Sequence, residues 1–178
     1  FVSSTAGDTQ ELLAMCLEVK TGKVLWQRTI GKDRRVPRNN MASPSPVTDG
    51  RTVCFTYGTG TIVAFSVDGK ELWRRDLERE LGHNALLFGY SSTPLLHRER
   101  LYVTALRNPK PDQYPKRVPP GVAVDPVDSY LTGLDVATGK TVWHVSRPSD
   151  ALRESVEAYV TPIPMRVGDG WQILLFGG

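Results

Sequence analysis

Gly133-Leu-Asp-Val-Ala-Thr-Gly-Lys-Thr-Val-Trp143 decides the fold of this chain, because its pattern occurs three times. The other copies are Cys16-Leu-Glu-Val-Lys-Thr-Gly-Lys-Val-Leu-Trp26 and Ala64-Phe-Ser-Val-Asp-Gly-Lys-Glu-Leu-Trp73. Each has a small residue, an apolar one, a polar one and Val, then a turn ending in Gly-Lys, two more residues and Trp. The glycine always stands four residues before the tryptophan, which defines the structural repeat residues Gly22, Trp26, Gly69, Trp73, Gly139 and Trp143.

A second motif alternates with the first and fixes the length of the repeat. Ser45-Pro46, Thr93-Pro94 and Thr161-Pro162 each lead into an apolar run. The first two tryptophans are 47 residues apart and the first two of these prolines 48 residues apart. The next spacings are 70 and 68 residues. Both markers therefore give a unit of about 47 residues, with about 22 extra residues in the last one.

Each unit is predicted to contain four short strands, A to D, with the Gly-Lys turn between C and D. Alternating apolar residues in 61–67 favour strands, and the turn glycines supply the positive φ that a hairpin needs. Antiparallel four-stranded units at this period are typical of a β-propeller. We expect an all-β fold, a single partial β-propeller domain that forms an open arc of a seven- or eight-bladed ring. Its parts are a partial blade 1–30, blade 42–77, blade 90–146 and a partial blade 159–178.

The irregular segments are expected on one face of the arc; they are residues 31–40, 78–89, 107–129 and 147–158. In a propeller the D–A and B–C loops share one face, and the tight turns share the other. The extra residues of the third unit, 107–129, contain six of the thirteen prolines, which predicts a polyproline-like excursion outside the blade. Binding usually resides in long loops on a rigid scaffold, so this face is the expected binding face.

Composition excludes several classes of function. The chain has 178 residues, of which 40% are hydrophobic and 23% charged, so it is globular. A net charge of +3 does not favour nucleic-acid binding. No apolar run is long enough to span a membrane, and no signal peptide is visible. Phe1 in place of an initiator Met indicates a cut in a longer chain.

The repeats resemble those of the quinoprotein-alcohol-dehydrogenase-like, or pyrroloquinoline-quinone (PQQ)-like, β-propellers, whose pattern is Ala-x-Asp-x-x-Thr-Gly-x-x-x-Trp. The 133–143 copy matches all but the first position. The resemblance implies that the three tryptophans pack between blades. Some family members are dehydrogenases that bind PQQ and calcium, and others are scaffolds without a cofactor. The spacer segments 40–46, 89–94 and 157–162, which end at the Ser/Thr-Pro motifs, look most like those of uncharacterised bacterial members. The resemblance therefore implies a periplasmic or secreted protein.

The residues favour the scaffold over the dehydrogenase. A dehydrogenase of this family would have an adjacent Cys pair, whereas Cys16 and Cys54 are 38 residues apart and are interpreted as buried free thiols, with a disulfide as the alternative. Calcium takes six to eight oxygen ligands. The available donors show no calcium-loop spacing and are interpreted as solvated loop residues: Glu154, Glu157, Asn39, Asn40 and Asn84. We therefore expect no catalytic residue, no metal and no cofactor, with PQQ and calcium only under the dehydrogenase alternative.

Two D–A loops carry the candidate ligand-binding residues. The densest polar cluster spans residues 32–40, and arginine suits carboxylate or phosphate ligands. His83 is the one histidine in an irregular loop. The candidates are Arg34, Arg35, Arg38, Asn39, Asn40, His83 and Asn84; a solvated charge run is the competing interpretation of the first cluster. The expected partner is a protein or small-molecule ligand on the D–A/B–C face, besides the remaining blades of the same chain.

Overall fold

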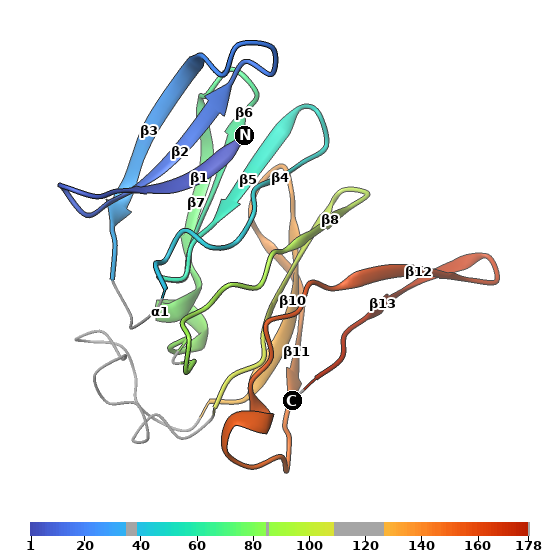
Figure 1. Ribbon diagram of the computed structural model, residues 1–178. Helices are drawn as coiled ribbons and strands as arrows, with labels where there is room; N and C mark the ends of the chain where they lie inside the picture. Colours follow the sequence, from blue (N-terminus) through green and yellow to red (C-terminus); the bar gives the residue numbers. More distant parts are fainter. Residues whose placement is uncertain (35–38, 85, 109–126, 178) are drawn as a thin grey trace.

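The structure is a computed structural model that describes residues 1–34, 39–84, 86–108 and 127–177. All six prolines of the 107–129 segment, and with them the predicted polyproline-like excursion, lie outside these residues. The described chain forms four antiparallel sheets in sequence order (Figure 1). The first sheet has the order β1-β2-β3, with strands β1 (Val2–Ala6), β2 (Glu11–Leu17) and β3 (Val24–Lys32).

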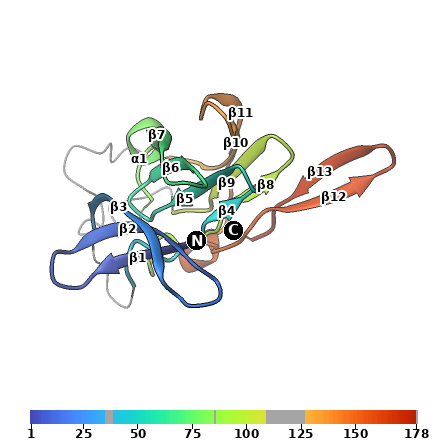
Figure 2. The same ribbon diagram turned by 90° about the horizontal axis from the view of Figure 1, so that it is seen from above.

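The second and third sheets are complete four-stranded units. The second contains β4 (Val47–Thr48), β5 (Thr52–Thr56), β6 (Thr61–Ser66) and β7 (Glu71–Asp76), and the third contains β8 (Leu95–His97), β9 (Arg100–Ala105), β10 (Ser129–Asp135) and β11 (Thr141–Arg147). The last sheet is a hairpin of β12 (Ile163–Val167) and β13 (Gly170–Leu174). Seen from above, the sheets follow one another as a fan (Figure 2). The prediction of an all-β fold built from propeller blades is confirmed.

Two short helices interrupt the segments that the sequence indicated as irregular. Helix α1 (Leu77–Leu81) follows β7, and the 3-10 helix η3 (Arg153–Val156) follows β11. Asp76 caps α1 by accepting a hydrogen bond from the backbone N–H of Arg79, and Gly82 ends it at φ +88°. Both helices lie at the lower end of the blades in Figure 1, away from the C–D turns. This lower end is called the helical face below.

Each of the first three sheets contains a β-bulge at the same place. Trp26 pairs with Cys16, Trp73 with Ala64 and Trp143 with Gly133, and the register shifts immediately after each of these small residues. A Cβ on Gly133 would lie 2.7 Å from the Trp143 ring. The first position of the motif is therefore small because the indole lies over it, and the bulge accommodates the extra residue.

The core lies between neighbouring sheets rather than within one. Between the first and second sheets, the Trp26 ring packs against Phe55 and Phe65 with centroids 6.1 and 5.6 Å apart. Between the second and third sheets, a buried cluster contains Cys54, Ile62, Leu77, Leu101, Val103 and Leu134. Both cysteines are free, as expected, but only Cys54 is buried, since Cys16 is partly exposed. Burial raises the pKa of the Cys54 thiol to about 12.

Candidate functional site

Three loops from different blades meet on the helical face at two partly exposed aromatic residues. Asn39 leads into the second sheet, Phe88 precedes the third and Tyr159 precedes the hairpin. The Asn39 side-chain amide donates to the Phe88 carbonyl at 2.9 Å, and the Phe88 backbone N–H donates to the Tyr159 hydroxyl at 3.0 Å. The two rings lie 6.4 Å apart and are 37% and 38% exposed. We call Asn39, Phe88 and Tyr159 the aromatic rim.

Glu157 supports this rim from beneath. Its carboxylate accepts hydrogen bonds from the backbone N–H of Leu87 at 2.6 Å and from the Tyr159 hydroxyl at 3.3 Å. The Ala158 backbone N–H donates to the Leu106 carbonyl at 3.2 Å, which ties the same segment to the third sheet. The expectation that Glu157 is a solvated loop residue is wrong, since the residue is only 8% exposed. Its charge is used to order two loops.

An ion pair between a partly buried arginine and a buried glutamate of α1 uses one of the predicted arginines. Arg34 binds Glu78 through both guanidinium arms, at 2.7 and 2.8 Å, and also donates to the Gly58 carbonyl. The Glu78 side chain is 2% exposed, and it accepts a further hydrogen bond from the Asn84 backbone N–H at 2.7 Å. A buried pair of this kind needs such extra hydrogen bonds to offset its desolvation. The guanidinium of Arg34 therefore binds groups of the protein itself.

A second buried arginine holds the loop that follows α1. Arg107 is 2% exposed and donates to the carbonyls of Leu81, Gly82 and His83, at 2.5, 2.7 and 3.0 Å. These carbonyls lie at the end of the helix, where a positive charge is favourable. Arg107 also donates to the Asp128 carbonyl at 3.0 Å, so one side chain links α1 to both ends of the 107–129 segment.

His83 and Asn84 do not reach the surface as the ligand hypothesis required. His83 is fully buried and Asn84 is 5% exposed, so the expectation of solvated loop residues is wrong for Asn84 as well. Burial, together with the positive charges of Arg107 and Arg34, lowers the pKa of His83 to about 4. His83 is therefore neutral at physiological pH.

The structure describes only some of the other candidates from the 32–40 cluster. Asn40 is exposed, and its side-chain oxygen accepts a hydrogen bond from the backbone N–H of Ala42, which shapes the turn before β4. Arg35 and Arg38 lie outside the described residues. Sequence reasoning missed Phe88 and Tyr159, although Phe88 directly precedes the spacer segment 89–94 and Tyr159 lies in the spacer segment 157–162. It also missed Glu78 and Arg107, which no local pattern marks.

The oxygen donors and cysteines considered for a quinone–calcium site lie apart from one another. Within 1–34, 39–84, 86–108 and 127–177, no three His, Cys, Asp or Glu side chains gather as metal ligands. Asn39 and Glu157 hold the rim, and the free Cys16 and Cys54 lie in separate sheets. No helix in the described part of the chain is long and apolar enough to cross a membrane.

The motif tryptophans connect each blade to the turn of the next one. The Trp26 indole N–H donates to the Val67 carbonyl at 3.0 Å, and its ring covers Gly69. The Trp73 indole N–H donates to the Val136 carbonyl at 2.8 Å, and its ring covers Gly139. The arginine two residues after each of these two tryptophans donates a hydrogen bond to the carbonyl of the glycine that the ring covers, from Arg28 at 3.0 Å and from Arg75 at 2.6 Å.

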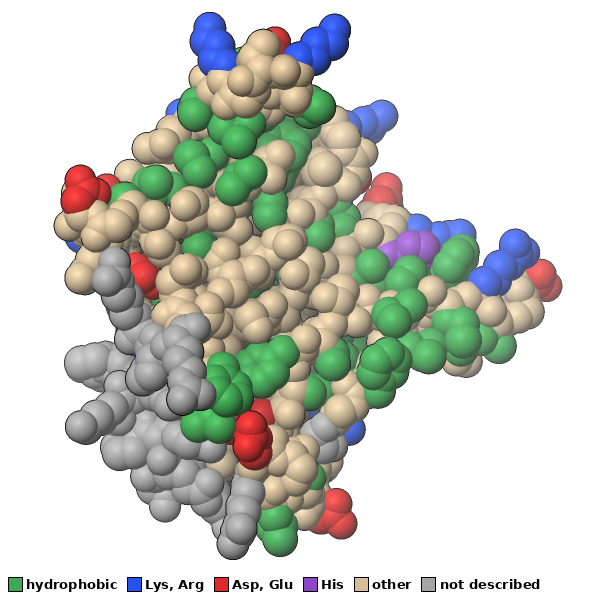
Figure 3. All heavy atoms as spheres, in the orientation of Figure 1, with side chains coloured by type: hydrophobic (Ala, Val, Ile, Leu, Met, Phe, Trp, Pro, Cys, Tyr) green, Lys and Arg blue, Asp and Glu red, His purple; other side chains and the backbone are tan. Residues whose placement is uncertain are grey.

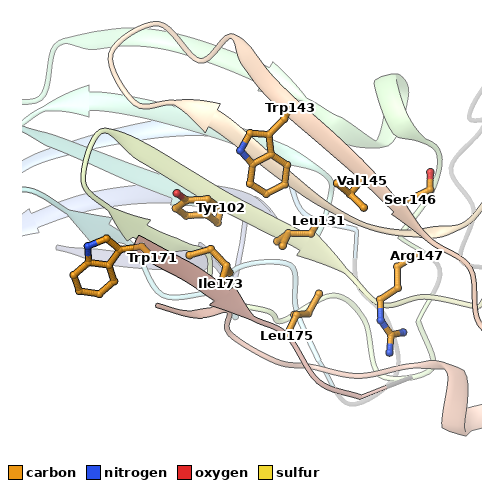
Figure 4. A pocket seen from close by; sticks show the side chains of 9 residues that line it. All are labelled: Tyr102, Leu131, Trp143, Val145, Ser146, Arg147, Trp171, Ile173 and Leu175. Atoms are coloured by element: carbon orange, nitrogen blue, oxygen red, sulfur yellow. The ribbon is translucent and has the colours of Figure 1, made fainter. Parts of the chain in front are cut away.

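In the third blade, the surface that carries the motif tryptophan faces a groove, whereas in the first two blades it contacts the turn of the following blade. The groove has a volume of about 550 Å³ and separates β10 and β11 from the hairpin β12–β13 (Figure 4). Trp143 lies on its wall, 5.7 Å from the Tyr102 ring, and Val145 occupies the position of Arg28 and Arg75. The opposite wall includes Trp171, Ile173 and Leu175. Its position matches the two inter-blade interfaces, so we interpret the groove as a packing surface between blades.

Comparison with known protein families places the chain among propeller proteins. Residues 9–169 match the family described as "Outer membrane protein assembly factor BamB". No curated protein matches. A europium-containing methanol dehydrogenase has a similar structure, with a TM-score of 0.52 and 16% identity over 82% of this chain and 22% of that one.

Two further solved structures have lower scores. A quinohemoprotein alcohol dehydrogenase from Comamonas testosteroni gives a TM-score of 0.49 and 13% identity over 81% of this chain and 19% of that one. BamB from Moraxella catarrhalis gives 0.47 and 17% identity over 90% and 41%. The chain thus spans less than half the length of each of these three proteins. At such identities the similarity concerns the fold alone.

Proposed function

We propose that this chain, which belongs to the family described as outer membrane protein assembly factor BamB, is part of a non-catalytic scaffold that binds a protein in the bacterial cell envelope. The family description refers to assembly, and assembly depends on binding rather than on chemistry. The family description supports a protein as the binding partner. The aromatic rim supports the helical face as the surface that binds it.

The observation that carries the proposal is the support of Phe88 and Tyr159. Binding energy in protein interfaces concentrates on a few residues, among which aromatic side chains are enriched. Here two aromatic rings are partly exposed, and the backbone N–H groups of Leu87 and Phe88 are held by Glu157 and Tyr159. A surface ordered before binding loses less entropy when a partner docks. The arrangement suits a preformed protein-binding site.

The binding experiment places a photo-crosslinking phenylalanine derivative at position 88 of the full-length protein in its own cells. Val19 is the matched control site, since it is fully exposed on the β2–β3 turn at the opposite face. We expect a discrete protein adduct from position 88 and none of the same mass from position 19. The adduct from position 88 should weaken when Tyr159→Ala removes the neighbouring ring. Identical adducts from both positions would refute the rim as the binding surface.

The competing hypothesis is a PQQ-dependent dehydrogenase, because such enzymes are built from similar blades. Its test uses the full-length protein with added PQQ and Ca²⁺. Retained cofactor absorbance and alcohol-dependent reduction of a dye are measured after excess cofactor is removed. We expect neither. Stoichiometric retention with turnover would overturn the scaffold proposal.

The proposed location is the periplasm or the exterior of the cell. It is supported by the family description, which refers to the outer membrane. Fractionation of cells that express the full-length protein tests it. Recovery with the cytoplasmic fraction alone would contradict an envelope role.

A further inference from the structure

One buried carboxylate on α1 joins groups from the first three blades. Glu78 accepts hydrogen bonds from both arms of the Arg34 guanidinium, at 2.7 and 2.8 Å, and Arg34 follows β3 of the first sheet. Helix α1 itself follows β7 of the second sheet, and the Leu77 backbone N–H at its start donates to the Gly60 carbonyl at 2.9 Å. Glu78 also accepts the backbone N–H of Asn84 at 2.7 Å, in the loop that leads to the third sheet. The loops of three blades therefore meet at this one side chain.

The surroundings of Glu78 leave its carboxylate little freedom to move. A Cβ on Gly60 would lie 2.6 Å from the Glu78 nitrogen and 2.8 Å from the Glu78 Cβ, so α1 starts in direct contact with the second blade. The Glu78 side chain is buried, and its partner Arg34 is itself held by the Gly58 carbonyl at 3.3 Å. The carboxylate is therefore a fixed acceptor for the Asn84 N–H, and the loop is ordered on it.

A short run of backbone hydrogen bonds connects Asn84 to the aromatic rim. The Asn84 carbonyl accepts the Leu86 N–H at 2.9 Å, and the Leu86 carbonyl accepts the Gly89 N–H at 3.1 Å. Phe88 stands between the last two of these residues, so its backbone belongs to the same turn. The neighbouring N–H of residue 87 is bound by the Glu157 carboxylate. The loop that presents Phe88 therefore has one carboxylate at its start and another at its end.

We propose that Glu78 is a positioning residue for the aromatic rim, because it fixes the start of the loop whose end presents Phe88 to a binding partner. Glu78 is buried and acts through the Asn84 N–H, without a contact of its own to the partner. The proposal rests on the proposed function, since it concerns how the same surface is ordered before binding. A loop fixed at one end only would sample more conformations, and more entropy would be lost on docking.

Two substitutions of Glu78 separate the ion pair from the ordering of the loop. Glu78→Ala removes both the partner of Arg34 and the acceptor of the Asn84 N–H. Glu78→Gln also removes the charge pair, but its side-chain oxygen can still accept that N–H. Both variants should therefore lower the melting temperature of the full-length protein, whereas only Glu78→Ala should loosen the loop. An ion pair that only stabilises the fold would make the loop respond equally to both variants.

Amide hydrogen exchange in the full-length protein, without a partner, measures the order of the loop. In Glu78→Ala we expect the backbone N–H groups of Leu87 and Phe88 to exchange roughly tenfold faster or more, the effect of losing a hydrogen bond to a buried group. In Glu78→Gln they should keep rates close to those of the unaltered protein. Val53→Ala is the control for general destabilisation, since Val53 is buried between the first and second sheets. Unchanged exchange in Glu78→Ala, or an equal increase in Val53→Ala, would overturn the proposal.

The unaltered full-length protein offers a second test, which does not depend on the folding of a variant. Hydrogen exchange at low concentrations of denaturant gives the free energy of opening at each amide. If Glu78 and Glu157 hold one loop, the amides of Asn84, Leu87 and Phe88 should open together with a common free energy. An Asn84 amide that stays closed while the other two open would show that the end of the loop is independent of Glu78, and the proposal would be wrong.

The photo-crosslinking phenylalanine derivative at position 88 distinguishes this proposal from the proposed function. The yield of the protein adduct should fall in Glu78→Ala and recover in Glu78→Gln. Faster loop exchange in Glu78→Ala with a full adduct yield would support the ordering of the loop by Glu78 and contradict the role of the rim in binding. Unchanged loop exchange would contradict the positioning role, whatever the adduct yield.

Discussion

Gly139 and Gly22 offer a matched test of whether the motif glycine exists for its turn or for the tryptophan above it. Both stand in four-residue turns, at φ +69° and +72°. Both donate their backbone N–H to the carbonyl four residues before, at 2.8 Å. They differ in what a Cβ would meet. At Gly22 nothing lies within 4 Å, whereas at Gly139 the Trp73 ring lies 2.6 Å away.

The magnitudes follow from this difference. An alanine at positive φ costs about 1–2 kcal/mol, and this cost is the same in both turns. Gly139→Ala also forces the indole aside, although its N–H is held by the Val136 carbonyl at 2.8 Å. Overpacking of this kind typically costs about 1–3 kcal/mol. We therefore expect a destabilisation of about 1–2 kcal/mol for Gly22→Ala and about 2–5 kcal/mol for Gly139→Ala.

Urea denaturation of the 178-residue chain, at one low protein concentration, measures both free energies of unfolding. The decisive comparison repeats Gly139→Ala in a Trp73→Ala background, where the ring that causes the clash is absent. There its cost should fall to that of Gly22→Ala. Equal costs for the two glycines in the unaltered background would refute the packing role of Trp73.

Three other predictions follow from the same structure. Trp73→Ala alone should reduce the free energy of unfolding by about 3–5 kcal/mol, and a melting temperature that moves by only a degree or two would contradict the core assignment. The unfolded chain protonates His83 near pH 6.5 and the folded chain only near pH 4, so stability should fall as the pH drops through this window, by on the order of 3 kcal/mol in total. His83→Gln should remove that part of the pH dependence, and an unchanged dependence in this variant would contradict the reasoning. The 178-residue chain should self-associate with rising concentration in sedimentation measurements, and a monomer at high concentration would contradict this. The reason is that exposed apolar residues cover the hairpin β12–β13 (Figure 3), among them Ile163, Met165, Val167 and Trp171.

The repeat can be predicted from the sequence because its signals are local and recur. Glycine and tryptophan stand at a constant spacing, and the small residue at the start of each copy identifies the position that faces the indole. Since each signal lies within about ten residues, it needs no knowledge of contacts between distant segments. Helix α1 escapes prediction, because five residues between a strand and a glycine give too short a pattern to recognise.

The site is harder to predict because its contacts join residues far apart in sequence. The charge density around Arg34 marks it as a ligand-binding candidate, but its partner Glu78 stands 44 residues later, in a segment expected to be irregular. Nothing in the sequence around Arg107 indicates that this arginine is buried beneath the end of a helix. The loop position of His83 suggests an exposed histidine, and only the packing of the two arginines around it reveals that it is enclosed.

The offset between tryptophan and glycine also bears on how such a chain can change in evolution. Trp26 and Arg28 hold the turn of the second unit in the same way as Trp73 and Arg75 hold that of the third. Loss of the whole second unit would bring Trp26 against the turn of Gly139. Duplication of that unit would create one more contact of the same kind between a tryptophan and the turn of the next blade. Recombination between repeats can therefore add or remove a blade while it keeps these tryptophan and arginine contacts with the turn. Val145 breaks this equivalence, so the joint after the third unit is not interchangeable with the first two.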